Sequence, residues 1–159
     1  MKKNETAPVE FAAPGLPRIF AAMVYDSLLL AAISIAYGAL VVAIEVALFG
    51  QPDSGKRIQW SLPAQLLITL GWLSAIIFFY VYFWQKFGQT LGMKTWRMQV
   101  VDASSNQLIT YRQAIKRCCA ACLSLACLGA GYWLKLIHPQ GRLLHDVLSG
   151  TKLILLKKK

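Results

Sequence analysis

Acidic residues are scarce in this chain. Seven Asp and Glu stand against 17 Lys and Arg among 159 residues, so the net charge is +10 and the pI is near 9.7. Charged residues of both signs make up only 15% of the chain, whereas soluble domains carry about a quarter. This shortage argues against a soluble protein, and in so apolar a chain it also disfavours a nucleic-acid binder.

Cysteine is sparse as well. The four cysteines all lie between residues 118 and 127. They are too few and too clustered to stabilise a small secreted domain by disulfide bonds. Hydrophobic residues, in contrast, are abundant. They make up 57% of the chain, and the mean hydropathy is +0.49, which excludes intrinsic disorder. The composition is typical of a small, basic membrane protein.

Two long runs carry no charge at all. Ser27–Ile44 holds 18 uncharged residues inside an apolar stretch at about 19–49. Ile58–Gln85 holds 28 uncharged residues around an apolar body at about 62–84. Because a helix needs about 20 apolar residues to cross the hydrocarbon core, both stretches predict transmembrane helices.

A third apolar run, Cys118–Leu134, contains Gly129 and Gly131 near its end. If this run crosses the membrane once, the two sides carry nine and eight Lys and Arg, which gives no orientation. If it dips in and returns at the glycines, the count is fifteen against two and obeys the positive-inside rule. The count favours a re-entrant or interfacial helical hairpin at about 111–137 over a third crossing. It also favours a multi-pass protein of the bacterial inner membrane with both termini in the cytoplasm.

The connector before this hairpin has a strand-like pattern. Residues 96–100 alternate apolar and polar side chains, and residues 107–109 can pair back with them, which predicts cytoplasmic strands at about 96–109. The segment 152–156 can add a third strand. Thr110 is the expected N-cap of a helix that begins at Tyr111 and is expected to place Arg112, Lys116 and Arg117 at the level of the lipid headgroups.

The expected fold is an all-α integral membrane protein. It has two transmembrane helices plus a re-entrant or interfacial helical hairpin, with a small cytoplasmic β-hairpin or three-stranded sheet. A single membrane domain at 17–156 follows a cytoplasmic tail at 1–16, which lacks the apolar core of a signal peptide. A basic tail at 157–159 is expected to rest on anionic lipid.

Asp26 is the most informative residue. An ionisable group inside a transmembrane helix costs ~2.5–3.5 kcal/mol at mid-helix, so it tends to face a partner or a watery cavity. Arg18 lies eight residues earlier, about 12 Å along the helix axis, which is too far for a direct ion pair. We expect a partner for Asp26 in the hairpin or in a second subunit, and the alternative is hydration near the cytoplasmic interface.

Three segments carry a resemblance to a known family. Residues 16–26 read LPRIFAAMVYD, residues 88–94 read GQTLGMK and are followed by MQVVD at 98–102, and residues 144–151 read LHDVLSGT. In this order they resemble the motifs of the RDD family, which is named for one arginine and two aspartates. The resemblance covers about 17–156, nearly the whole chain.

The resemblance implies roles for particular residues. Arg18 and Asp26 match the arginine at the start of the first helix and the aspartate within it. For the second aspartate, Asp146 is the first choice and Asp102 the alternative. The resemblance also implies a membrane-embedded protein, of a family whose members are generally held to move unidentified ligands across the bilayer.

Two functions fit these observations. In the first, an oligomer transports an unidentified ligand or ion. Asp26 exchanges a proton or cation, and Arg18 and Asp146 set its charge state. In the alternative, the chain is an accessory or structural membrane module in which Arg18, Asp26 and Asp146 form a polar clasp. His145, which precedes Asp146, is expected to be a hydrogen-bonding element near Arg18.

We do not expect the protein to be an enzyme, because the sequence contains no recognisable pair of nucleophile and general base. No metal or cofactor is expected, because four cysteines on one helical run cannot converge on zinc. The expected partners are the bilayer, with anionic lipids at the basic cytoplasmic face, and further copies of the chain or a partner membrane protein, since two spans cannot enclose a path. No nucleic acid is expected.

Overall fold

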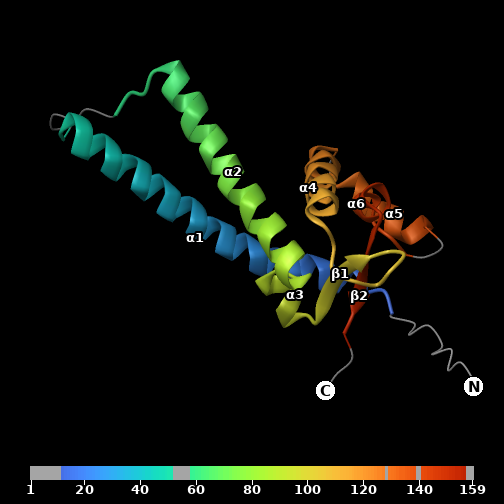
Figure 1. The fold of residues 1–159 in the computed structure, drawn as a ribbon. Coiled ribbons are helices and arrows are strands. Elements are labelled where there is room, and N and C mark those ends of the chain that lie inside the picture. Colours follow the sequence, from blue (N-terminus) through green and yellow to red (C-terminus); the bar gives the residue numbers. More distant parts are fainter. Residues whose placement is uncertain (1–11, 52–57, 128, 139–140, 157–159) are drawn as a thin grey trace, which may run out of the picture.

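A computed structural model describes residues 12–51, 58–127, 129–138 and 141–156. Figure 1 shows two long helical arms that diverge from a smaller base. The arms are α1 (Leu16–Phe49) and α2 (Leu62–Phe87). The base holds the shorter elements, which in chain order are α3 (Leu91–Thr95), β1 (Met98–Asp102), α4 (Tyr111–Ala126), α5 (Ala130–Ile137), α6 (Leu144–Ser149) and β2 (Thr151–Leu155). Most of the predicted tail at 1–16, the basic tail at 157–159, and the cations Lys56 and Arg57 lie outside the described residues.

Both arms are long and apolar enough to cross a membrane, so the two stretches predicted from the sequence are helices that qualify as candidate spans. Each has a proline in its first turn, where the missing N–H costs no helical hydrogen bond, and each ends at a glycine. At 1.5 Å per residue, the 34 residues of α1 extend over about 50 Å, well beyond the ~30 Å hydrocarbon core. The helix is therefore longer than one upright crossing of the hydrocarbon core requires.

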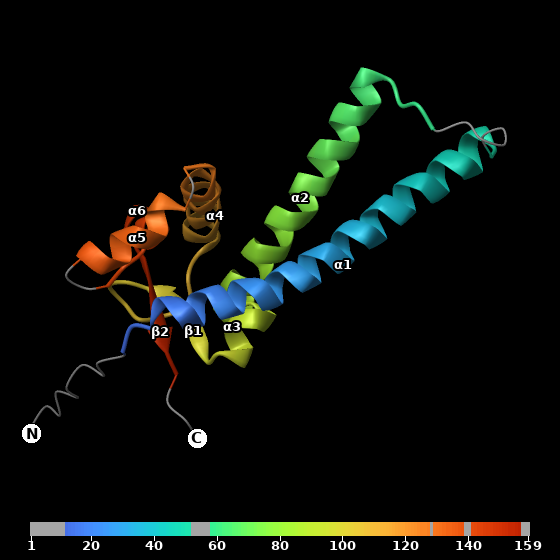
Figure 2. The ribbon, with the colours of Figure 1, turned by 180° about the vertical axis from the view of Figure 1, so that it is seen from behind.

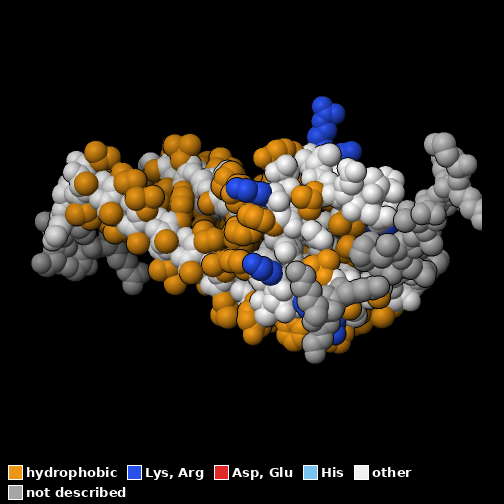
Figure 3. Space-filling view, turned by 60° about the horizontal axis from the view of Figure 1, so that its bottom comes forward, with side chains coloured by type: hydrophobic (Ala, Val, Ile, Leu, Met, Phe, Trp, Pro, Cys, Tyr) orange, Lys and Arg blue, Asp and Glu red, His pale blue; other side chains and the backbone are white. Residues whose placement is uncertain are grey.

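The first third of α1 packs against the base. Its buried residues are Ile19, Ala22 and Asp26, whose spacing places them on one helical face against the base. Figure 2, seen from behind, shows these first turns running across the base before the helix leaves it. Beyond Asp26 the helix has no buried residue. Figure 3 shows hydrophobic side chains covering both arms, with Lys and Arg side chains appearing from the junction with the base onward.

Polar side chains join the two arms. The Tyr37 hydroxyl donates to the Ile68 carbonyl oxygen at 2.9 Å, and the Trp72 indole N–H donates to the Ser34 hydroxyl at 2.9 Å. The Tyr37 ring end occupies the space that a side chain at Gly71 would fill. Such bonds between helices replace the hydrogen bonds that water cannot supply in lipid.

The sheet has two strands and differs from the predicted hairpin. β1 pairs antiparallel with β2, with Met98 opposite Leu155 and Asp102 opposite Thr151. The tail strand is thus the partner of β1, and residues 107–109 form no strand. Expecting a β-hairpin at 96–109, or three strands, was wrong. The backbone N–H groups of Ser104 and Ser105 bind the Asp102 carboxylate, so the chain turns out of the sheet after β1.

The helix pair α4–α5 follows this turn, over the residues predicted to form a helical hairpin. Thr110 caps α4 in a reciprocal capping box with Gln113, which confirms the predicted N-cap. α4 and α5 meet at an angle of 95°. Gly129 has φ +75°, a left-handed conformation that an L side chain rarely adopts, so the break falls at one of the predicted glycines.

The core of the base is formed by residues from both strands, from the helices and from the segments that connect them. Fully buried Met98 and Val100 of β1 pack with Leu143, Ile109 and Ala114. The arms contribute to the same cluster through Ile19 and Ala22 of α1 and through Val81 and Trp84 of α2. The ends of the transmembrane helices are therefore part of the base.

Candidate functional site

Asp26 lies where α1 leaves the base, with 5% of its surface exposed. The Thr90 hydroxyl donates to Asp26 Oδ2 at 2.6 Å, and the Gly92 backbone N–H donates to Asp26 Oδ1 at 2.9 Å. Both carboxylate oxygens are therefore hydrogen-bonded, and both donors come from the 88–94 segment that the sequence singles out. Asp26 joins the first transmembrane helix to the turn that follows the second.

The local structure of α3 explains these two bonds. Thr90 caps α3, because its hydroxyl accepts from the Met93 backbone N–H at 3.2 Å while donating to Asp26. Gly92 lies so near α1 that an added Cβ would collide with the Ala22 carbonyl oxygen and come within 2.9 Å of the Asp26 carboxylate. Only a residue without a side chain lets α3 approach α1 this closely.

The surroundings of Asp26 are polar but uncharged. On α2, Tyr80 lies close enough to interact electrostatically with the Asp26 carboxylate. In the part of the chain that the structure describes, no Lys or Arg forms an ion pair with Asp26. The carboxylate is therefore held by neutral donors, and the described residues supply no counter-ion for its charge.

Asp146 on α6 has a different environment. Its side chain is 1% exposed and forms an ion pair with Arg117 of α4, which is 3% exposed as a residue. The Arg117 guanidinium also donates to the Thr151 hydroxyl at 2.9 Å and lies 5.1 Å from the Trp84 ring centroid. The second Asp146 oxygen accepts from the Leu143 backbone N–H at 3.3 Å. One ion pair thus connects α2, α4, α6 and β2.

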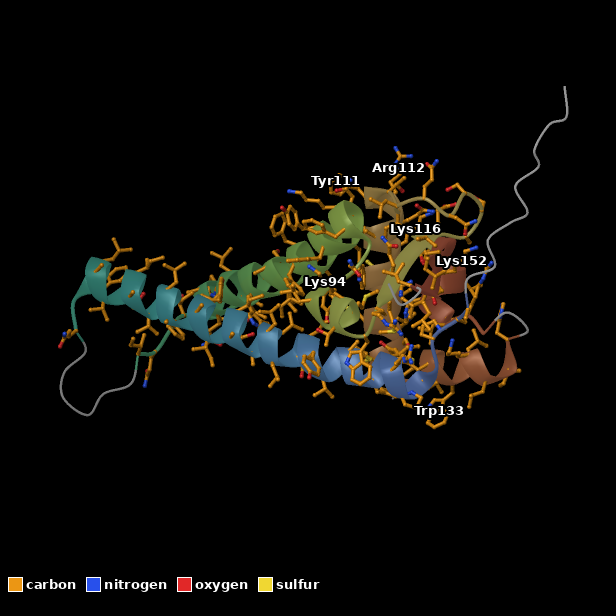
Figure 4. All side chains as sticks on the ribbon, turned by 90° about the horizontal axis from the view of Figure 1, so that it is seen from below. Lys94, Tyr111, Arg112, Lys116, Trp133 and Lys152 are labelled. Carbon is orange, nitrogen blue, oxygen red and sulfur yellow. The ribbon has the colours of Figure 1, made fainter. Side chains whose placement is uncertain are left out.

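Arg117 is a residue that sequence reasoning misplaced. Together with Arg112 and Lys116 it was expected at the lipid headgroups, and that expectation is wrong because Arg117 is buried. A usable signal exists: Arg117 comes three residues after Ala114 and seven before Ser124, so all three share the buried face of α4. Figure 4 shows Arg112 and Lys116 at the outside of the base instead.

The three residues of the expected polar clasp do not form one cluster. Asp26 binds Thr90 and Gly92, and Asp146 binds Arg117. Arg18 is half-buried and makes no hydrogen bond or ion pair to the residues that the structure describes. The arginine beside a buried aspartate is thus Arg117.

His145 is 4% exposed and packs its ring against Tyr132, with 5.4 Å between the centroids. Its charged neighbour is Arg117, where the sequence suggested Arg18. Burial, followed by the nearby positive charge of Arg117, holds the pKa of His145 well below its ordinary value, so the imidazole is neutral at pH 7. Its Nδ1 atom has no partner among the described residues.

Asp102, the alternative second aspartate, organises the turn after β1. Its carboxylate accepts from Ser104, Ser105 and the Gln113 side-chain amide. These bonds, with that from Ser104 the strongest, hold the pKa of Asp102 far below its ordinary value. Within the described ranges, no three His, Cys, Asp or Glu side chains come together as a metal-binding group.

The family model of the RDD family matches residues 12–150. The chain belongs to the RDD family. The match includes Arg18 and both buried aspartates of this RDD protein, as well as Thr90, Gly92 and Arg117, which hold those aspartates in place. Searches of curated proteins and of solved structures found no match.

Proposed function

We propose that this RDD protein is a subunit of an oligomeric transporter in the bacterial inner membrane and that it moves a small cation or a proton. Asp26 is the exchanging group. The observation that carries the proposal is a buried carboxylate held by Thr90 and Gly92, which are both neutral. A charge without a protein counter-ion can take up a proton or a cation, and buried ionisable groups mark such routes in membrane proteins.

The position of Asp26 supports this role. Residues 27–49 of α1 follow it, and at 1.5 Å per residue they extend over about 34 Å, enough to cross the hydrocarbon core. Asp26 then lies at the inner mouth of the span. The Leu155 backbone N–H donates to the Ala12 carbonyl oxygen at 2.9 Å, so the two described ends of the chain lie together at the base.

The distribution of Lys and Arg side chains supports one orientation of the protein in the membrane. Lys and Arg side chains appear over the base and its junction with the arms (Figure 3), and the cations Lys94, Arg112, Lys116 and Lys152 lie on the base in Figure 4. The positive-inside rule then assigns the base and both chain ends to the cytoplasm, facing anionic lipid.

In the same proposal the α4–α5 hairpin lies at the membrane interface or re-enters it. Its exposed apolar residues are Ile115, Leu123, Leu125, Trp133, Leu136 and Ile137. Tyr111 and Arg112 stand together at the start of α4 in Figure 4, where an aromatic ring and a cation suit the headgroup level. The 95° bend turns the hairpin away from a straight crossing.

Transport by this fold needs more than one chain. Two spans cannot surround a path, so Asp26 from several copies, or from one copy and a partner membrane protein, lines it. Asp146 has a structural role in this scheme, because Arg117 already neutralises it. Asp26 is left as the aspartate free to change its charge.

The test is flux through purified protein in liposomes that carry pH and cation dyes. Wild-type protein is expected to conduct, and Asp26→Asn to abolish the flux. Glu45→Gln is the matched control, because Glu45 is an acid on the same helix, far from the Asp26 site, and its flux should equal that of wild type. Flux that survives Asp26→Asn removes the mechanism.

A second function is favoured by a specific observation. Both Asp26 oxygens are used to attach α3 to α1, as expected of a structural residue in an accessory membrane module. In that case wild-type protein conducts nothing, and Asp26→Ala lowers the thermal stability in detergent. Measuring flux and stability on the same preparations separates the two functions.

A further inference from the structure

A small pocket opens beside the Asp26 site and is not used by the function proposed above. It lies where α2 ends and α3 begins, with a volume of about 150 Å³. Its lining residues are Phe83, Phe87, Gln89, Thr90, Leu91 and Lys94. The pocket therefore combines an apolar wall, two uncharged polar groups and one cation.

The cationic, polar and apolar residues of the lining can each bind a different chemical group of a ligand. Lys94 is exposed, so its ammonium can bind an anion at the rim. The Gln89 side-chain oxygen is buried and has no hydrogen-bond partner within the described residues, so it lacks a donor. Phe87 and Leu91 are 45% and 48% exposed, which leaves apolar surface open at the same place.

The neighbouring residues on α2 indicate the level of the membrane. The Lys86 ammonium donates to the Tyr82 hydroxyl at 2.9 Å and lies over the Tyr82 and Phe87 rings, 5.2 and 5.6 Å from their centroids. Tyrosine and lysine at the end of a transmembrane helix are typical of the headgroup region, where lysine extends toward water. Because Phe87 also lines the pocket, the pocket opens at the depth of lipid phosphates.

We propose that this pocket binds one phospholipid by its headgroup. The phosphate pairs with Lys94, and the ammonium of an ethanolamine headgroup lies against the polar side chains of Gln89 and Thr90 in the lining. An acyl chain lies along Phe87 and Leu91. Thr90 lines the pocket and donates to Asp26, so the bound headgroup lies beside the residue that holds the carboxylate.

The test is a calorimetric titration of detergent-solubilised, full-length protein with short-chain phosphatidylethanolamine. Replacing Lys94 by Gln removes a charge-assisted hydrogen bond, so we expect an affinity loss of about tenfold or more. Lys94→Arg should retain most of the affinity. Gln89→Leu should also weaken binding, because it removes one of the two uncharged polar side chains that line the pocket.

The matched control is Lys116→Gln, which removes an equally exposed cation from α4, outside the pocket. Its affinity should equal that of wild type. Inorganic phosphate and a short-chain diacylglycerol complete the comparison. Phosphate binding as tight as the phospholipid would assign the pocket to a free anion, and equal diacylglycerol binding would reduce it to an apolar surface. Either result, or Lys94→Gln with wild-type affinity, overturns the proposal.

Discussion

The two buried aspartates of this RDD protein are held in opposite ways. Asp146 shares its buried position with the Arg117 guanidinium, so the pair is neutral as a whole. Asp26 is almost as buried, but its hydrogen bonds come from a hydroxyl and a backbone N–H. The two acids are buried to a similar extent, but only Asp146 has a cationic partner among the described residues. Asp146 is paired with a cation inside the base, whereas Asp26 is the acid to which the proposed function assigns charge exchange.

The largest effect is expected at the ion pair. Asp146→Asn leaves the Arg117 charge buried without its partner, and breaking a buried pair in this way costs about 3–5 kcal/mol of the free energy of unfolding. Thermal or denaturant unfolding in detergent measures the loss. Replacing both partners, with Asp146→Leu and Arg117→Met, should be less damaging than either single change. A single variant as stable as wild type would show that the pair is not what stabilises the base.

At the Asp26 site the largest stability effect is expected from Gly92→Ala. The added Cβ meets the Ala22 carbonyl oxygen and the Asp26 carboxylate, so α3 must move away from α1 at a cost of about 1–3 kcal/mol. Gly38→Ala is the control, because an added Cβ there meets nothing within 4 Å. Unfolding curves of the two variants give the difference, which vanishes if α3 does not pack on α1.

The stability of the base should depend on pH through His145, which lies near Arg117. Folding holds the pKa of His145 below its value of 6.5 in the unfolded chain, so the unfolded state binds more protons as the pH falls through 6.5. Stability should therefore decline below that pH, by about 2 kcal/mol between pH 7 and pH 5. Melting temperatures across this range should show the decline in wild type and less of it in His145→Gln. An equal decline in both would assign it to other groups.

The smallest stability effect is expected from Asp26→Asn. An asparagine amide can still accept from Gly92 and can donate to the Thr90 hydroxyl, so the two hydrogen bonds persist with one reversed, and stability should change by only about 1 kcal/mol. Melting in detergent checks this. A loss as large as that of Asp146→Asn would place Asp26 with the structural residues.

The features that were predictable from the sequence are those with local signals. Apolar length alone identifies α1 and α2, and the Thr110–Gln113 capping box marks the start of α4. The break at Gly129 follows from a glycine inside an apolar run. Each of these signals lies within a few residues of the structure that it specifies.

The features that sequence reasoning missed depend on contacts between distant segments. β1 pairs with β2 some fifty residues later, and alternation alone does not choose between that partner and the nearer 107–109 segment. The helical spacing places Arg117 on the same face of α4 as Ala114 and Ser124, but its ion-pair partner Asp146 lies 29 residues later and is identified only by the fold. A partner for Asp26 was expected in the hairpin or in a second subunit, whereas its donors Thr90 and Gly92 come from the segment after α2, more than sixty residues along the same chain.

The central claim is that Asp26 exchanges charge while Asp146 stabilises the base. The most direct test measures flux in liposomes for Asp26→Asn and Asp146→Asn, each divided by the amount of folded protein recovered. We expect Asp26→Asn to be recovered in normal yield and to conduct nothing, whereas Asp146→Asn should be recovered poorly and conduct normally per folded molecule. Wild-type flux from Asp26→Asn, or loss of flux per folded molecule from Asp146→Asn alone, would contradict it.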